Sequence, residues 1–243
     1  MALTDKIEIP RRTMVLFFLI DTSGSMEGSK IGAVNTAIEE VIPAIREVSN
    51  ENADAEIKIA ALEFSSGARW ITEQGPIEAE HFRWNYLEAA GVTDFGDACR
   101  SLNEKLSTKA FMKEATGSFA PAIFLLSDGE PTDVWEGALN ELKQNNWFKT
   151  SVKVAVAIGE DANKDMLKEF TGTMEAVLET HNAATLKKMI KFVSVRASQI
   201  ASKSSNATGQ DLGDEQKQHE LNANIQELQD EIAASPDNDQ LDW

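Results

Sequence analysis

The chain has 243 residues, of which 42% are hydrophobic, and a formal net charge of -17 at pH 7. This length allows one α/β domain of ordinary size with a sizeable core, or two small ones. No apolar run approaches the roughly 18 residues that a membrane span needs, so we expect no membrane association, and the negative charge disfavours nucleic acid and anionic lipid as partners.

Metal sites built from cysteine and histidine are also disfavoured. Cys99 is the only cysteine, which excludes an internal disulfide and a cysteine-rich zinc site. His81, His181 and His219 are far apart in the sequence. Since a single cysteine is consistent with a reducing compartment, we expect a cytoplasmic location.

The first apolar segment, residues 14–20, follows Arg11 and Arg12. Charged residues before an apolar run resemble a secretory signal, but the run ends at Asp21 and no small-residue cleavage site follows. We therefore interpret this segment as a buried first strand. It opens a domain over residues 13–203, after an N-terminal arm over residues 1–12.

Helical periodicity follows, with apolar residues recurring every three or four positions: Ile31, Val34, Ile38, Val41, Ile42 and Ile45. Ser29 is the predicted N-cap of this helix, and Pro43 is predicted to kink or split it. Similar patterns predict further helices over residues 95–111, 134–147, 163–170 and 184–200.

Near-continuous apolar runs at residues 57–64, 121–126 and 152–158 are typical of strands that helices cover on both faces. A strand over residues 68–72 follows too closely for a parallel crossover and suits a hairpin, while residues 176–179 supply a sixth strand. We expect an α/β fold with a doubly wound, mostly parallel six-stranded sheet, one antiparallel edge strand and helices on both faces.

Composition changes near Lys203. Residues 204–243 contain ten acidic residues and one lysine, a net charge of -9 and more than half of the total. This acidic tail begins with a linker-like stretch over residues 204–209. A narrow apolar stripe then predicts a short amphipathic helix, which either binds a partner's groove, pairs as a coiled coil, or is a transient helix in solvent: Leu221, Ile225, Leu228 and Ile232.

Oxygen-bearing side chains follow two of the predicted strands and precede one helix. Asp21, Ser23 and Ser25 follow the first strand, Thr93 precedes the helix over residues 95–111, and Asp128 follows the strand over residues 121–126. If these strands are neighbours, the five side chains converge at the edge where open α/β sheets bind ligands. Such oxygen donors form an octahedral site for Mg²⁺, with Mn²⁺ or Ca²⁺ as other candidates.

The order and spacing of these five residues resemble the metal-ion-dependent adhesion site of the von Willebrand factor A family. That motif is written D-x-S-x-S, followed by a threonine on a second loop and an aspartate on a third, and the resemblance covers about residues 13–203. It implies a Rossmann-like fold and a protein-binding role without catalysis. In such sites the serines contact the metal directly, the threonine and aspartates contact it directly or through water, and a partner's Asp or Glu carboxylate takes the open position.

Residues 127–133 and 91–93 also resemble short bacterial cytoplasmic members of this family, which occur with tellurite-resistance and stress-response systems. Some of these members occur alongside a kinase and a phosphatase. The resemblance implies a scaffold or adhesion module in such a system, with a kinase or phosphatase as its partner.

Other residues near these loops have simpler interpretations. We expect Asp94, Glu130 and Asp133 to be solvated rim or helix N-terminal residues rather than metal ligands. For the aromatic residues near the loops we favour core packing over ligand recognition: Trp84, Tyr86 and Trp135.

Two other functions compete with this interpretation, one based on the same loops and one on the acidic tail. An enzyme is less favoured because residues 24–30 lack the spacing of a phosphate-binding loop, and Ser23 stands where a phosphohydrolase-like enzyme would need a second aspartate. The alternative is a scaffold that acts mainly through its acidic tail. Carboxylates of that tail, including Asp242, are also candidate ligands of the metal, within one molecule or between neighbours.

Overall fold

The structure, a computed structural model, describes residues 11–114, 117–202 and 214–234. Its strands are β1 (Arg12–Asp21), β2 (Ala55–Ser65), β3 (Gly67–Trp70), β4 (Ile77–Glu78), β5 (Ala122–Ser127), β6 (Val152–Ile158) and β7 (Val177–Thr180). Its helices are α1 (Ser29–Glu51), α2 (Phe95–Lys105), α3 (Glu136–Leu142), α4 (Asn146–Thr150), α5 (Lys164–Thr171), α6 (Ala183–Ala201) and α7 (Asp214–Ala233), with 3₁₀ turns η1 (Gly24–Met26) and η2 (Met174–Ala176).

The strands form one mixed sheet in the order β3-β2-β1-β5-β6-β7. β1 is central and pairs in parallel with both β2 and β5. Its side chains alternate between two cores: Met14 and Leu16 belong to one, Val15 and Phe17 to the other. The predicted α/β sheet, buried on both faces, is therefore confirmed.

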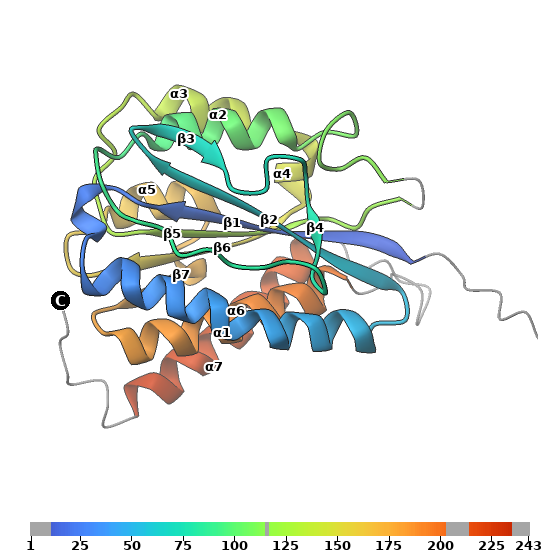
Figure 1. Cartoon of the computed structure of the whole chain (residues 1–243). Helices are drawn as coiled ribbons and strands as arrows, with labels where there is room; N and C mark the ends of the chain where they lie inside the picture. The colour runs from blue at the N-terminus through green and yellow to red at the C-terminus, as the bar shows by residue number, and fades with distance from the viewer. Residues whose placement is uncertain (1–10, 115–116, 203–213, 235–243) are drawn as a thin grey trace, which may run out of the picture.

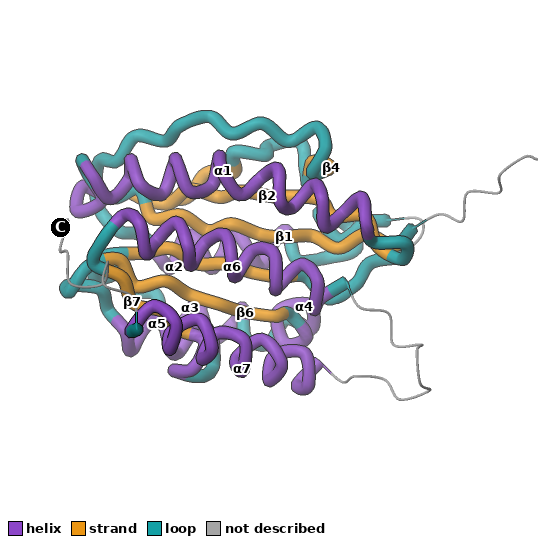
Figure 2. The backbone as a smooth tube through the Cα atoms, turned by 90° about the horizontal axis from the view of Figure 1, so that it is seen from below, coloured by secondary structure: helices purple, strands orange, loops and turns teal. Residues whose placement is uncertain are grey.

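Helices cover both faces of this sheet (Figure 1). The core on one face includes apolar residues of α1, α6 and α7, and the other includes residues of α2, α3, α4 and α5. Viewed from below, α1, α6 and α7 form one layer in front of the strands (Figure 2). Among the described residues, no helix combines the length and the apolar character needed to cross a bilayer.

The sheet has one strand more than predicted. The additional strand, β4, pairs antiparallel with β2 at Lys58↔Glu78 and Ile59↔Ile77, so β2 has two antiparallel partners, β3 and β4. Two residues are too few to show the alternation that identifies a strand in a sequence.

The start of α1 differs from expectation, and the predicted split at Pro43 does not occur. Gly28, with φ of 82°, occupies the N-cap position, and Ser29 is the first helical residue. Pro43 does not split the helix, which continues to Glu51. Because Pro43 is on the exposed side, water can satisfy the carbonyl that loses its helical hydrogen bond.

Two predicted helices are shorter than expected. α2 ends at Lys105 rather than at residue 111. The helix expected over residues 134–147 is divided into α3 and α4 by Asn145, whose side chain accepts a hydrogen bond from Trp147 N at 2.9 Å and donates one to Leu106 O at 3.0 Å. An asparagine that bonds the local backbone in this way competes with helix continuation.

The apolar stripe of the acidic tail is helical and packs on the chain's own domain. α7 has 20 residues, and Leu221, Ile225, Leu228 and Ile232 are buried in the core shared with α1 and α6. The predictions of a partner-binding or solvated stripe are therefore wrong for this helix. The linker over residues 204–209 and the end of the tail lie outside the described residues, as do residues 1–10, so the domain boundaries stay predictions.

A side-chain amide fixes α7 to the sheet. Pairing of β7 with β6 begins only at Ala155↔Val177, which leaves the start of β6 without a strand on that side. There the Gln218 carboxamide accepts from Lys153 N at 2.8 Å and donates to Lys153 O at 3.0 Å. The amide thus takes the place of a neighbouring strand.

Candidate metal centre

Three loops meet where β1 and β5 end, at the left of Figure 1. The parallel register pairs Ile20 with Leu126, so Asp21 and Ser127 end neighbouring strands at the same edge. The first loop then turns through η1 into α1, and the third loop continues from Ser127 towards α3. Parallel strands therefore bring two of the predicted loops together, as open α/β sheets do at their ligand sites.

Asp21 is fully buried and held by two donors. Its Oδ1 accepts from Ser23 N at 2.9 Å, and its Oδ2 accepts from Ser127 Oγ at 2.6 Å. Burial raises the pKa of Asp21, the Ser127 and Ser23 hydrogen bonds oppose that rise, and the Asp128 carboxylate adds to it. An ionised Asp21 therefore favours a nearby cation.

The first and third loops contact each other through oxygen atoms. Ser23 Oγ lies 3.0 Å from Ser25 Oγ, and Ser25 Oγ donates to Asp128 Oδ1 at 2.7 Å. Asp128 is only 1% exposed. Four of the five predicted residues are therefore linked in one hydrogen-bonded cluster.

A long segment between β4 and α2 brings Thr93 to this cluster. Asn35 of α1 holds it by accepting from Leu87 N at 2.8 Å and donating to Leu87 O at 2.9 Å. Gly24 N then donates to Gly91 O at 3.0 Å, which joins the segment to the first loop two residues before Thr93. The second loop is thus fixed to the first by its own backbone.

Gly129 leaves space between the loops. A Cβ atom there would lie 3.3 Å from Ser25 Oγ and 3.6 Å from Thr93 Oγ1. The two hydroxyls therefore face the same small space, and glycine is the residue that keeps it open. With Thr93, the structure brings together all five predicted residues.

The donor set fits a hard divalent cation. It contains two carboxylates and three hydroxyls, which are the oxygen ligands that Mg²⁺ and Ca²⁺ prefer. The cluster has only two residues of the His, Cys, Asp and Glu type. Within residues 11–114, 117–202 and 214–234, no group of three or more such side chains is arranged to hold a metal. Ser25 is exposed, while Asp21, Ser23, Thr93 and Asp128 are at most 5% exposed, so the cluster opens to solvent at Ser25.

Sequence reasoning missed two residues of this site. Ser127 is 1% exposed and bonds Asp21, and Lys30 Nζ lies 2.6 Å from Asp128 Oδ2. Ser127 immediately precedes a predicted ligand at the end of a strand. Lys30 is a cation in the first turn of a helix, where the helix dipole disfavours positive charge. Both signals were present in the sequence.

The neighbouring acidic residues behave as predicted. Asp133 accepts from Gly96 N at 3.0 Å and from Asp97 N at 3.2 Å, so it caps α2 from another loop. Asp94 occupies the N-cap position of α2 and accepts from Gly67 N at 2.8 Å. Glu130 is an exposed rim residue.

The aromatic residues near the loops divide into two groups. Trp84 is 9% exposed and donates its Nε1–H to Asn35 Oδ1 at 3.2 Å, and Trp135 packs on Phe95 with ring centroids 5.9 Å apart. Tyr86 is 58% exposed and donates its hydroxyl to Glu39 Oε2 at 2.7 Å. Core packing is therefore wrong for Tyr86, because the segment runs over the outer side of α1 at that point.

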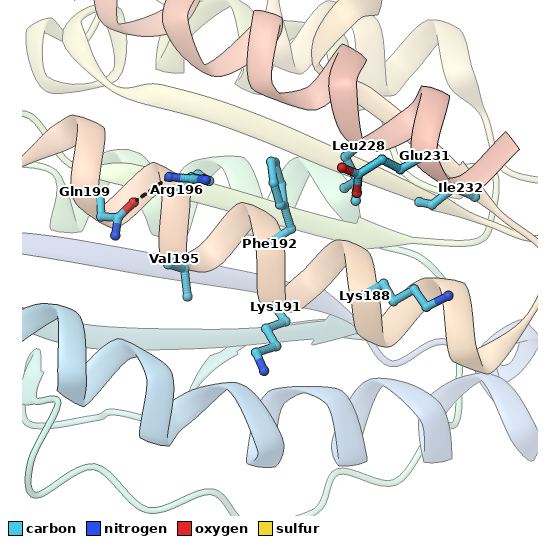
Figure 3. Close-up of a pocket in the computed structure, with 9 residues that line it drawn as sticks. All are labelled: Lys188, Lys191, Phe192, Val195, Arg196, Gln199, Leu228, Glu231 and Ile232. Carbon is cyan, nitrogen blue, oxygen red and sulfur yellow. Dashed lines mark hydrogen bonds between the residues drawn. The ribbon is translucent and has the colours of Figure 1, made fainter. Parts of the chain in front are cut away.

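A groove of about 610 Å³ between α6 and α7 is separate from this centre. Phe192, Val195 and Leu228 contribute apolar side chains to it, and exposed Lys188 and Lys191 lie along its α6 side (Figure 3). None of the five predicted metal residues lines it.

Comparisons with known proteins agree with the fold. A family profile described as the von Willebrand factor type A domain matches residues 16–192. No curated protein matches the chain. Similar solved structures include a von Willebrand factor type A protein from Catenulispora acidiphila, with 19% identity and a TM-score of 0.57 over 77% of this chain and 43% of that chain.

Two further similar structures are a pilus adhesin and a mussel byssus protein. One is the pilus adhesin SpaC from Lactobacillus rhamnosus GG, with 14% identity and a TM-score of 0.59 over 77% of this chain and 30% of that one. The other is proximal thread matrix protein 1 from the mussel byssus with a zinc-occupied MIDAS motif, with 14% identity and a TM-score of 0.57 over 78% of this chain and 48% of that one.

At these identities the solved structures show a shared fold. This chain spans less than two thirds of each of the three, 43%, 30% and 48% of their lengths. The family profile, by contrast, covers more than half of the chain described here. The chain therefore belongs to the von Willebrand factor type A domain family.

Proposed function

We propose that this chain is a protein-binding module that holds one divalent cation, Mg²⁺ in the first instance, and binds a partner's Asp or Glu carboxylate through it. The ligands are Asp21, Ser23, Ser25, Thr93 and Asp128. The observation that carries the proposal is the cluster of two carboxylates and three hydroxyls at one open edge of the sheet. The proposal assigns binding rather than catalysis to this cluster.

The surroundings of the cluster suit a protein partner. The solvent-facing member is the neutral hydroxyl of Ser25, so a bound cation would retain charge that attracts an anion there. Val92, next to Thr93, is 46% exposed, and Val134, in the loop before α3, is 81% exposed. Apolar side chains beside a polar centre are typical of protein interfaces.

Calorimetric titration of Mg²⁺ and Mn²⁺ tests the metal site. We expect saturable binding to the wild type and none to Asp21→Ala, with an unchanged circular dichroism spectrum. Glu130→Ala is the matched control, because it removes an exposed carboxylate from the third loop without touching the cluster. Equal affinities in the wild type and Asp21→Ala would refute the assignment.

We also propose a bacterial cytoplasmic stress-response or tellurite-resistance setting, with an associated kinase or phosphatase as the partner. The support is the sequence of residues 127–133 and 91–93. Purified candidate kinase and phosphatase should bind the wild type with Mg²⁺ and lose binding with chelator or with Asp21→Ala. Binding that survives both changes would remove the metal from the interaction.

The chain's own carboxylates are a second source of the ligand. Ile232 and Ala233, at the end of α7, line a pocket with Glu179 and His181, which lie at the carboxyl end of β7. α7 therefore ends at the sheet edge that carries the cluster, and Asp242 follows α7 in the sequence. If the residues after α7 occupy the metal, deleting residues 235–243 should strengthen acetate binding to the Mn²⁺-loaded protein, and unchanged binding would exclude this role.

A further inference from the structure

Lys30 occupies an unfavourable position for a cation. It is the second residue of α1, whose first turn has no acidic residue. The N-terminus of a helix carries partial positive charge, which disfavours a lysine there. Residues that break a local rule are often retained for a functional site.

The side chain of Lys30 reaches across to the third loop. Its Nζ lies 2.6 Å from Asp128 Oδ2, and the two side chains are 16% and 0% exposed. Asp128 Oδ1 accepts from Ser25 Oγ. The two oxygens of this carboxylate are therefore divided: Oδ2 faces the ammonium group, and Oδ1 faces the predicted ligands of the first loop.

Lys30 also changes the charge of the centre. Asp21 and Asp128 carry two negative charges when ionised, and Lys30 reduces the total to one. A divalent cation would then leave one positive charge at the centre, whereas without Lys30 it would leave none. The residual charge matters because the proposed ligand is an anion.

We infer that Lys30 is a positioning residue whose charge tunes the centre. It weakens the affinity of the centre for the cation and strengthens the affinity of the cation-loaded centre for a carboxylate. This inference rests on the proposed function, since it requires a divalent cation at the five residues. Lys30, which is not one of the five proposed ligands, would thus contribute to the preference of the loaded centre for an anionic partner.

Lys30→Met tests the first half, because methionine retains much of the side-chain volume and removes the charge. We expect Mg²⁺ to bind at least about tenfold more tightly by calorimetry, since a unit charge close to a divalent ion in a partly buried site has a large effect. Lys30→Arg keeps the charge and should stay within about threefold of the wild type. Lys191→Met makes the same charge change on the exposed side of α6 and should leave the affinity unchanged (Figure 3).

Acetate tests the second half. With each variant saturated with Mn²⁺, displacement of metal-bound water by acetate can be followed by water proton relaxation. We expect acetate to bind Lys30→Met several-fold more weakly than the wild type, and Lys191→Met as well as the wild type. A residue that only stabilises the fold would not move the two affinities in opposite directions.

The outcomes separate the inference from the proposed function. A wild type without saturable Mg²⁺ binding would refute both. A wild type that binds Mg²⁺, with equal or weaker binding by a folded Lys30→Met, would overturn the inference alone. If Lys30→Met does not fold, Lys30→Gln replaces it, and the same opposite shifts are expected. Equal acetate affinities in the wild type and in Lys30→Met would also overturn the inference.

Discussion

The candidate metal centre and the contact between α7 and the sheet bury polar groups in different ways. At the candidate centre Asp21 and Asp128 are buried and the Lys30 side chain is 16% exposed, so three ionisable groups lie largely out of water. At α7, a neutral amide, Gln218, satisfies the backbone of Lys153 beside an apolar stripe. Buried charges cost more free energy than neutral hydrogen-bonded groups, so the first arrangement is not explained by stability.

This difference predicts which property each region controls. Changes in the α7 contact should lower the free energy of unfolding and leave the metal affinity of the folded protein unchanged. Changes in the loops of the candidate metal centre should change the metal affinity without lowering the free energy of unfolding of the metal-free protein. A substitution that lowered both properties together would contradict the separation.

The largest expected loss of stability comes from Ile225→Ala. Ile225, a residue of α7, is fully buried against the core that α7 shares with α1 and α6. Truncating such a side chain leaves a cavity and costs about 2–5 kcal/mol of unfolding free energy, measurable by urea denaturation. Glu227→Ala, on the exposed side of the same helix, should change it by less than about 0.5 kcal/mol. An equal effect of both substitutions would mean that α7 does not pack as described.

Gly129→Ala should act on the metal instead. The added methyl group would lie 3.3 Å from Ser25 Oγ and 3.6 Å from Thr93 Oγ1, in the space between the proposed ligands. We expect Mg²⁺ affinity to fall by about 10–100-fold, similar to the loss of a residue that orients metal ligands, with little change in melting temperature. The control is Gly137→Ala in α3, where no atom lies within 4 Å of the new Cβ. A normal affinity in Gly129→Ala would place the cation elsewhere.

Gln218→Ala sharpens the comparison, because it removes polar contacts rather than apolar volume. Two hydrogen bonds to Lys153 would be lost, and the partly buried backbone groups would be left to water. The expected cost is about 1–2 kcal/mol of unfolding free energy, without an effect on Mg²⁺ binding. Gln226→Ala, exposed on the same helix, is the comparison. A loss as small as that of Gln226→Ala would show that the amide does not replace a strand.

Much of the fold could be predicted because its signals are local. The run over residues 14–20 is apolar at every position, which is typical of a strand that helices cover on both faces. β4 and the break at Asn145 could not be predicted, since each depends on a contact with a distant part of the chain. The stripe of α7 was visible, but its partner was not, because periodicity shows that a face is buried without showing what buries it.

The candidate site was predictable for a related reason. Asp21 and Asp128 follow strands whose pairing brings their ends together, so strand order alone places them side by side. Thr93 follows no strand, so strand pairing does not place it; its position before a helix and the resemblance to a known motif indicated it, and an irregular segment held by Asn35 carries it to the cluster. Lys30 was overlooked because a lysine at the start of a helix has no meaning until its partner, Asp128, is known.

The smallest expected effect is a pH dependence that tests whether Asp21 is an unfavourable charge without metal. Burial raises the pKa of Asp21 in the folded protein, so the folded state binds this proton more tightly than the unfolded state does. The stabilisation from protonation is therefore complete below the ordinary pKa and is lost as pH rises through the folded value. In chelator, the melting temperature of the wild type relative to Asp21→Asn should rise as pH falls from 7 towards that value.

With saturating Mg²⁺ the sign should reverse. Protons then compete with the cation for Asp21, so acidification should lower the melting temperature of the wild type relative to Asp21→Asn. Glu130→Gln, exposed on the third loop, should follow the wild type in both conditions. If chelator and Mg²⁺ gave the same pH dependence, Asp21 would not be a metal ligand, and its burial would need a structural explanation like that of Gln218.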